Sequence, residues 1–169
     1  MKTTCSIRKM QAFDINDLSQ GFISQVWPGR EEILTRYFKE QESGEREVLI
    51  ADLTGVVAGY ITILPYAKQG PFAGMAPELS DFNVFEPFQN QGIGNLLLKE
   101  AENRVKLVSD KVTLGVGLHS GYGPAQRLYI KRGYIPDGSG VWYRNQPLEM
   151  NATIQNNDDL VLYLSKKFE

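Results

Sequence analysis

One segment restricts the possible folds of this chain more than any other, and it runs from residue 79 to residue 109. Residues 79–85 have the composition of a strand. Residues 92–109 carry apolar side chains every three or four positions, which predicts an amphipathic helix with one buried face. A short polar loop joins the two. A strand that leads through a tight loop into a long helix is typical of α/β proteins, in which helices pack on the faces of a sheet.

The rest of the chain continues this alternation. Strands are predicted at residues 5–10, 47–53, 56–64, 111–117 and 159–166, with another from Tyr134 onward, and helices at 14–26, 30–42 and 124–132. Asp14 is the expected N-cap of the first helix, and Gly133 is the expected left-handed cap of the last. The order predicts a mixed α/β sheet with helices on its faces. Because we find no repeat, low-complexity tract or Ser/Pro-rich linker, we expect one domain over residues 1–169.

Composition narrows the class of protein. Hydrophobic residues make up 42% and charged residues 22%, which favours a folded core over disorder. The formal net charge is −2, so no overall field attracts nucleic acid or an anionic membrane. Cys5 is the only cysteine, which excludes an internal disulfide and a four-cysteine zinc site, and we expect no metal. The longest apolar stretch, 56–64, is far shorter than the roughly 20 residues of a membrane helix, and the N-terminus has no apolar signal core. We expect a cytoplasmic protein.

The loop before the long helix has the features of an anion site. Free N–H groups at a helix start, together with the positive end of the helix dipole, attract negative charge. Gly92 and Gly94 carry no Cβ that would keep a phosphate away from the backbone. The chain has no G-x-x-x-x-G-K-S/T string, which excludes a nucleoside-triphosphate P-loop. Leu97 stands where a dinucleotide fingerprint needs its third glycine, which excludes that motif as well. What remains is Gln89-x-x-Gly92-x-Gly94. The alternative is a plain strand-to-helix turn whose glycines only permit the bend.

In these residues the sequence resembles the GNAT superfamily of acyl-CoA-dependent N-acetyltransferases. Gln89, Gly92 and Gly94 match the family's pyrophosphate motif, R/Q-x-x-G-x-G/A, and residues 125–134 match a second, downstream family pattern. The resemblance covers roughly residues 7–143. It implies the family's single-domain fold, a mixed, mostly antiparallel sheet flanked by helices. The chain departs from the pattern at Tyr122, where the family often has an Asn that bonds towards the cofactor arm; the Tyr hydroxyl is an alternative partner.

By resemblance, acetyl-CoA is the cosubstrate. The backbone of residues 82–84 would pair with the pantetheine arm, and the amides of residues 90–95 would hold the pyrophosphate, which carries a charge of about −2. Arg127, Lys131 and Arg132 would either meet the 3′-phosphate or form a solvated basic face. The predicted cofactor-binding residues are Phe82, Asn83, Val84, Gln89, Asn90, Gln91, Gly92, Ile93, Gly94 and Asn95.

Two residues are predicted to be catalytic, Tyr129 and Asp81. By resemblance, Tyr129 donates its phenolic proton to the leaving sulfur, and a phenol with a reference pKa of about 10 is protonated at neutral pH. The alternative for Tyr129 is a core aromatic residue. The N–H of Val84 is the expected donor to the thioester carbonyl. Asp81 would anchor a cationic amine or pass its proton through water; His119, Glu86 and direct proton loss to water stay open as alternatives.

The function expected is therefore an N-acetyltransferase that moves an acetyl group from acetyl-CoA to a primary amine by direct attack in a ternary complex. The alternatives are a non-catalytic acyl-CoA sensor of the same fold and an unrelated nucleotide binder. The acceptor is a small-molecule or peptide amine that the sequence does not name. Aromatic residues outside the motifs, above all Tyr66 and Phe72 in the loop after residue 64, are candidates for its pocket. No nucleic-acid or membrane partner is expected, and a homodimer through exposed strands is left open.

Overall fold

The structure is a computed structural model that describes residues 4–169. The chain forms two compact units, one of residues 1–64 and 79–104 and the other of residues 65–78 and 105–169. No helix in the described part of the chain is both long and apolar enough to cross a membrane. The single domain that the sequence suggests stays a prediction.

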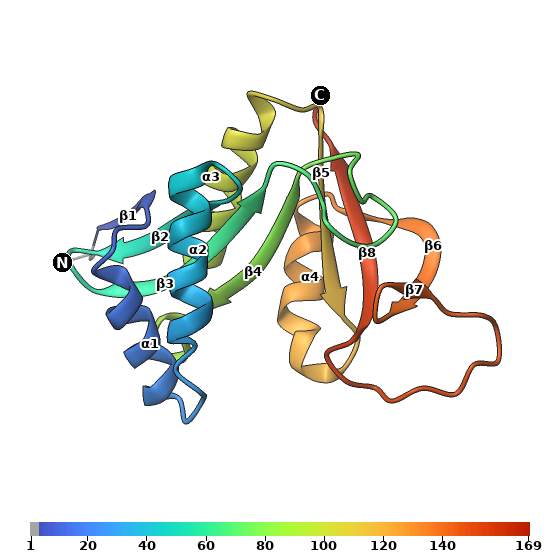
Figure 1. Ribbon diagram of the computed structural model, residues 1–169, viewed down its shortest axis with the longest axis horizontal. Helices are drawn as coiled ribbons and strands as arrows, with labels where there is room; N and C mark the ends of the chain where they lie inside the picture. Colours follow the sequence, from blue (N-terminus) through green and yellow to red (C-terminus); the bar gives the residue numbers. More distant parts are fainter. Residues whose placement is uncertain (1–3) are drawn as a thin grey trace. The chain divides into compact units, whose positions relative to one another are not determined.

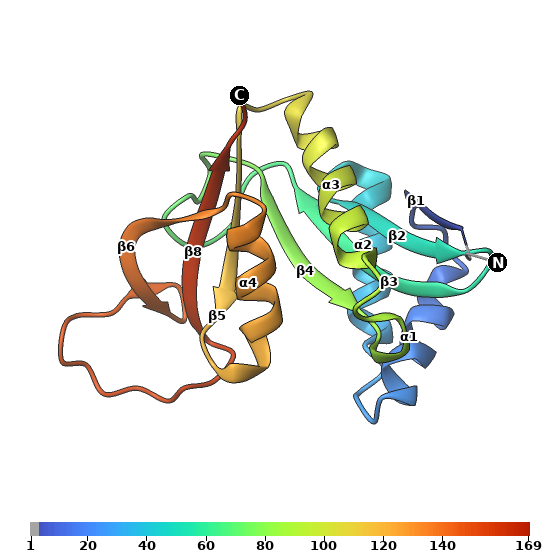
Figure 2. The same cartoon turned by 180° about the vertical axis from the view of Figure 1, so that it is seen from behind.

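The first unit contains four neighbouring strands and three α-helices. The strands follow the order β1-β2-β3-β4, and the ladders β1–β2 and β2–β3 are antiparallel. Helices α1 and α2 cover one face of these strands and α3 covers the other (Figures 1 and 2). The elements of this unit are β1 (Cys5–Lys9), α1 (Asp14–Ser24), α2 (Glu31–Ser43), β2 (Glu47–Leu53), β3 (Val57–Leu64), β4 (Glu78–Val84), the 3-10 turn η1 (Glu86–Phe88) and α3 (Ile93–Lys106). The first residue of β4, Glu78, and the last two of α3, residues 105–106, are counted with the second unit.

The second unit contains the other four strands in the order β5-β8-β6-β7, joined by antiparallel ladders. Helix α4 lies beside β5 in both views (Figures 1 and 2), and a long loop of residues 148–159 leads from β7 to β8. The elements are β5 (Lys111–Gly117), the 3-10 turn η2 (Ser120–Tyr122), α4 (Gly123–Lys131), β6 (Ile135–Tyr143), β7 (Gln146–Pro147) and β8 (Leu160–Lys167).

The core of the first unit lies between the strands and the helices α1 and α2. Strand β3 is buried along its whole length, as expected of a strand covered on both faces. Leu18 and Phe22 of α1 and Leu34 of α2 pack with Tyr60 of β3 in one cluster. Burying each such side chain contributes about 1.5–3 kcal/mol. The apolar face of each early helix therefore determines which side of the sheet it covers.

The structure confirms the predicted order of elements and the predicted class, an α/β fold of mostly antiparallel strands flanked by helices. The predicted strands 47–53 and 111–117 have the same bounds as β2 and β5, the ends of the other elements shift by at most three residues, and η1, η2 and β7 were not predicted. Helix α1 ends at Ser24, because Val26 adopts a left-handed φ of 63°. The left-handed cap at Gly133 is confirmed by its φ of 94°.

The prediction that Asp14 caps α1 was wrong. Phe13 occupies the N-cap position, and Asp14 is the first residue inside the helix. The Asp14 carboxylate accepts the N–H of Gln11 at 2.7 Å and two hydrogen bonds from Arg8 at 2.7 and 2.8 Å. Asp14 is fully buried, so this ion pair satisfies a charge that would otherwise be costly to bury. The sequence pattern of a helix cap does not reveal that Asp14 has a charged partner, Arg8, in strand β1.

Gly59 of β3 permits a close approach to β4. A Cβ placed on Gly59 would lie 2.3 Å from the carbonyl oxygen of Asn83 and 2.9 Å from Cα of Val84. Just beyond, the N–H of Phe85 donates to the carbonyl of Ala58 at 2.9 Å. Because Gly59 has no side chain, the backbone of β4 can lie this close to β3.

We predict that Gly59→Ala destabilises the protein by about 1–3 kcal/mol, because the new methyl group meets backbone atoms that have little room to move. Gly123→Ala is the matched control: Gly123 has right-handed helical φ and open space around its missing Cβ. That change is expected to stabilise α4 by up to about 1 kcal/mol. Urea unfolding of both variants measures the two signs, and a Gly59→Ala protein as stable as wild type would contradict the packing described here.

Candidate functional site

The loop between β4 and α3 has an exposed backbone in an unusual conformation. Residues 89–92 are all exposed. Asn90 has a φ of 59° and Gly92 a φ of 83°, both in the left-handed region that glycine and asparagine tolerate best. A Cβ on Gly92 would meet nothing within 4 Å. The space over Gly92 is therefore open to a ligand, and the glycine at this position is required by the backbone angle as well.

Side-chain amides hold the loop in shape. Gln89 Nε2 donates to the carbonyl of Val84 at 2.9 Å, and Gln91 Nε2 donates to the carbonyl of Pro87 at 3.0 Å. From α1, Gln25 Oε1 accepts the N–H of Glu86 at 2.5 Å. In this structure the Gln89 side chain therefore acts on the loop itself. A glutamine at the start of the motif has a structural reason, since it ties the end of β4 to the start of the loop.

The backbone N–H groups at the end of the loop and the very start of α3 are left for a ligand. Near the start of α3, the N–H of Leu96 donates to the carbonyl of Gly92 at 3.2 Å. Because α3 has 14 residues, its dipole places partial positive charge at this end. These donors and this charge fit an anionic group such as a pyrophosphate. Within residues 4–169, no acceptor bonds the N–H groups of Asn90, Gln91, Gly92, Ile93 and Gly94.

Asp81 of β4 lies in a dense hydrogen-bond network. Arg30 donates to both of its carboxylate oxygens, at 3.0 and 2.7 Å. The hydroxyl of Tyr37 donates to Oδ2 at 2.9 Å, and Asn83 Nδ2 donates to Oδ1 at 2.8 Å. Burial raises the pKa of Tyr37, and the Asp81 charge raises it further, so this phenol stays a donor. A carboxylate with four protein donors has little free capacity to accept a proton from a substrate, and the catalytic role of Asp81 stays a prediction.

Tyr129 lies on α4, in the second unit. Its side chain is buried and its ring centroid is 5.8 Å from that of Tyr134. Burial, and to a lesser degree nearby Tyr122, raise the pKa of Tyr129 above the usual value for a phenol. The hydroxyl is therefore protonated at neutral pH and able to donate. Both the acid role and the core role that the sequence suggested for Tyr129 require such a neutral phenol.

His119 and Tyr122 share a partner that sequence reasoning missed. His119 Nε2 and Asp158 Oδ1 are 2.8 Å apart, and the hydroxyl of Tyr122 donates to the same oxygen at 3.1 Å. His119 Nδ1 accepts the N–H of Gly121 at 3.1 Å. Both ring nitrogens are thus engaged, which argues against His119 as the base. The hydrogen bonds from His119 and Tyr122 hold the pKa of Asp158 below its usual value. No local pattern marks Asp158, since it lies 36 residues or more along the chain from these partners.

The other candidates are spread over the two units. In the first unit, Glu86 is exposed at the start of η1. In the second unit, Arg127 and Lys131 are exposed on α4. Of the loop aromatics, Tyr66 is 63% exposed, which leaves it available to a ligand. Phe72 is half-buried, with the ammonium group of Lys111 5.8 Å from its ring centre.

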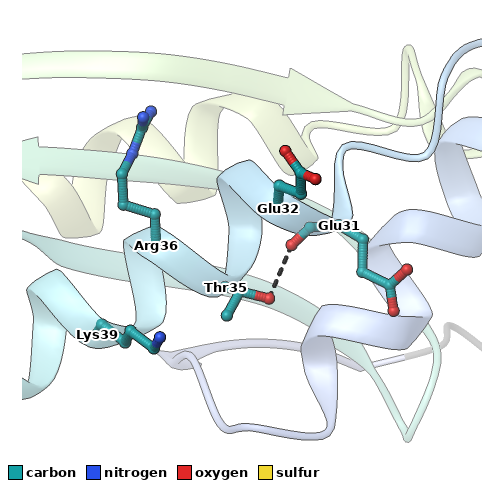
Figure 3. A pocket seen from close by; sticks show the side chains of 5 residues that line it. All are labelled: Glu31, Glu32, Thr35, Arg36 and Lys39. Atoms are coloured by element: carbon teal, nitrogen blue, oxygen red, sulfur yellow. Dashed lines mark hydrogen bonds between the residues drawn. The ribbon is translucent and has the colours of Figure 1, made fainter.

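A hollow over α2 does not resemble a ligand site. It is shallow and lies over α2 alone (Figure 3), lined by Glu31, Glu32, Thr35, Arg36 and Lys39. The charged side chains point away from one another, and the hydroxyl of Thr35 is bonded to the carbonyl of Glu31 at 2.8 Å. In the described residues, 4–169, no three His, Cys, Asp or Glu side chains gather in a way that would hold a metal ion.

Comparisons with known proteins show the family and the fold of this chain. The model of the acetyltransferase (GNAT) family matches residues 13–134. A GNAT-family protein from Desulfovibrio desulfuricans has the same fold, with a TM-score of 0.74, 16% identity, and 97% of this chain and 99% of that one covered. The yncA protein from Salmonella typhimurium, solved with its cofactor acetyl-CoA, gives a TM-score of 0.67 at 18% identity, covering 98% of this chain and 94% of that one.

A third structure, the PaiA N-acetyltransferase from Thermoplasma acidophilum in complex with coenzyme A, gives a TM-score of 0.68 at 17% identity and covers 98% of this chain and 99% of that one. At these identities the structures show a shared fold. No curated protein sequence matches this chain. The family model covers most of the chain, including the loop with Gln89, Gly92 and Gly94 and the helix with Tyr129, so this chain belongs to the GNAT family of acetyltransferases.

Proposed function

We propose that this protein transfers an acetyl group from acetyl-CoA to a primary amine. The observation that carries the proposal is the loop before α3, in which consecutive N–H groups have no acceptor among the described residues and Gly92 leaves the backbone open. Family membership supports the reaction, and the yncA and PaiA structures, which hold acetyl-CoA and coenzyme A, support the cosubstrate.

The residues of the loop fit the charged part of this cosubstrate. The amides of residues 90–95 would hold the pyrophosphate, aided by the dipole of α3. The backbone of Phe82, Asn83 and Val84 would pair with the pantetheine arm, as the family resemblance implies. When bound, acetyl-CoA supplies an activated thioester carbonyl. The protein's part is to orient it and to stabilise the charge that develops during transfer.

The acetyl transfer balances as follows. The neutral amine nitrogen attacks the thioester carbonyl carbon, the C–N bond forms, and the C–S bond breaks. The amine proton passes to water, since Asp81 and His119 are both engaged with other partners. We propose that the hydroxyl of Tyr129 donates a hydrogen bond to the leaving sulfur, and that the N–H of Val84 stabilises the carbonyl oxygen. Both roles rest on the family resemblance.

A second candidate function is an acyl-CoA sensor without turnover. The engaged state of Asp81 and His119 favours it, because neither side chain offers a free basic atom. An assay of thiol release from acetyl-CoA with a panel of amines separates the two functions. Thiol release that depends on an amine supports the enzyme. Tight coenzyme A binding with no release for any amine supports the sensor.

We predict that Gly92→Asp abolishes coenzyme A binding, because it places a side chain and a negative charge where the pyrophosphate would lie. Gly44→Asp is the matched control. Gly44 ends α2 with a φ of 82°, against 83° for Gly92, and both have open space around the missing Cβ. The backbone strain is therefore similar, while only one change is at the loop. Isothermal titration with coenzyme A measures binding, and normal binding by a folded Gly92→Asp protein would place the phosphates elsewhere.

We predict that Tyr129→Phe lowers kcat by about 10²-fold with little change in coenzyme A affinity. Tyr134→Phe, a second buried tyrosine in the same unit, is the control. Because burial raises the pKa of Tyr129, its proton is still bound at about pH 9, and wild-type kcat should rise rather than fall from about pH 7 to about pH 9 as the amine loses its proton. Steady-state kinetics over this range tests both statements. An unchanged kcat in Tyr129→Phe would remove Tyr129 from the mechanism.

A further inference from the structure

Two residues with left-handed backbone in the first unit are joined to each other by their side chains. Arg30, just before α2, has a φ of 61°, and Asp81, within β4, has a φ of 46°. Neither is glycine, so each conformation costs free energy and persists only where the surroundings hold it. The Arg30 guanidinium donates two hydrogen bonds to the Asp81 carboxylate, at 3.0 and 2.7 Å. The pair is partly buried, with side-chain exposures of 23% and 15%.

Arg30 is held from several directions besides. Its Nη1 donates to the hydroxyl of Tyr60 at 2.5 Å, and its guanidinium lies 5.1 Å from the ring centre of Phe22. Its carbonyl accepts the N–H of Leu34 at 3.0 Å, which starts α2. Tyr60 is fully buried in β3. Arg30 therefore ties the turn between α1 and α2 to the strands beneath it.

Asp81 directly precedes the strand segment assigned to the pantetheine arm, residues 82–84. Asn83 Nδ2 donates to Asp81 Oδ1 at 2.8 Å and to the hydroxyl of Tyr60 at 3.3 Å. At the far end, the carbonyl of Val84 is bonded by Gln89. The segment is thus restrained at one end by the Arg30–Asp81 pair and at the other by the loop.

We propose that Arg30 is a positioning residue for the cofactor. By bonding both carboxylate oxygens of Asp81, it holds the left-handed backbone of Asp81 in β4 and so sets the backbone of residues 82–84. The proposal rests on the proposed function. It gives Asp81 a positioning role through Arg30 in place of a proton-transfer role. A bidentate arginine suits this task, because its planar fork fixes the orientation of a carboxylate, whereas a lysine supplies only a point charge.

The chain offers a matched control in the same unit. Arg8 makes the same bidentate contact with Asp14, at 2.7 and 2.8 Å, and also bonds Asp52. Arg8 is 28% exposed, close to Arg30, but its partners lie outside β4 and its loop. Arg30→Gln and Arg8→Gln therefore each remove a bidentate arginine–aspartate pair, Arg8→Gln also loses the bond to Asp52, and only Arg30→Gln is coupled to residues 82–84.

The experiment measures coenzyme A binding by isothermal titration and Tm by calorimetry for wild type, Arg30→Gln, Arg30→Lys and Arg8→Gln. Both glutamine variants are expected to lower Tm. The Kd for coenzyme A is expected to rise about tenfold in Arg30→Gln and in Arg30→Lys, and to stay within about twofold in Arg8→Gln. Equal Kd values in wild type and folded Arg30→Gln, with Tm lowered as in Arg8→Gln, would overturn the proposal.

Asp81→Asn separates positioning from proton transfer. Asn tolerates a left-handed φ but weakens the pair with Arg30. Positioning predicts a raised Kd for coenzyme A, an unchanged shape of the pH profile of kcat, and a double variant Arg30→Gln/Asp81→Asn no weaker in binding than the worse single variant. A base role predicts an unchanged Kd, a kcat about 10²-fold lower and an altered pH profile, and this outcome would also overturn the proposal.

Failure of the proposed function has a different signature. It appears in the wild type, as no binding of coenzyme A and no amine-dependent thiol release. Failure of the positioning role appears only in the variants, against a wild type that binds coenzyme A. The Kd of the wild type therefore decides the first question before the variants decide the second.

Discussion

The candidate site depends on backbone N–H groups, those of residues 90–94, that have no acceptor in the described part of the chain. A helix leaves the N–H groups of its first turn without intrahelical acceptors, and most proteins satisfy them with a capping side chain. At the start of α3 the chain instead uses its amide side chains elsewhere: Gln89 bonds the carbonyl of Val84 and Gln91 that of Pro87. The N–H groups of residues 90–94 have no acceptor within residues 4–169, and a phosphate would supply acceptors there.

The first unit also contains two buried or mostly buried carboxylates, each paired with an arginine. Asp14 is completely buried against Arg8, and Asp81 is mostly buried against Arg30. Removing two charges from water is costly, and the attraction between them compensates only when the geometry is good and further donors satisfy the oxygens. Asp81 meets that condition through Tyr37 and Asn83. Such a pair adds little net stability but fixes orientation, which is the property needed beside a strand that is to bind a cofactor.

Local patterns determined much of the fold because they act over a few residues. The 3.6-residue repeat in α3, the glycine after α4 and the alternation of elements were sufficient for the order and class of the fold. The motif at Gln89, Gly92 and Gly94 predicted a bend that glycine permits, and Gly92 has a left-handed φ of 83°, while the role of the loop in binding a phosphate stays a prediction. The prediction for Asp14 failed because its partner is not local. Arg8, in strand β1, donates two hydrogen bonds to the Asp14 carboxylate.

The partners of the candidate catalytic side chains were decided by tertiary contacts alone. Arg30 and Asp81 are 51 residues apart in the chain, and His119 and Asp158 are 39 apart, so no local spacing relates them. By itself the sequence determined the order of helices and strands, which glycines can bend the backbone and which family pattern is present. The tertiary structure decided which carboxylates are engaged and which backbone donors stay open, because both depend on groups that meet only when distant segments pack together.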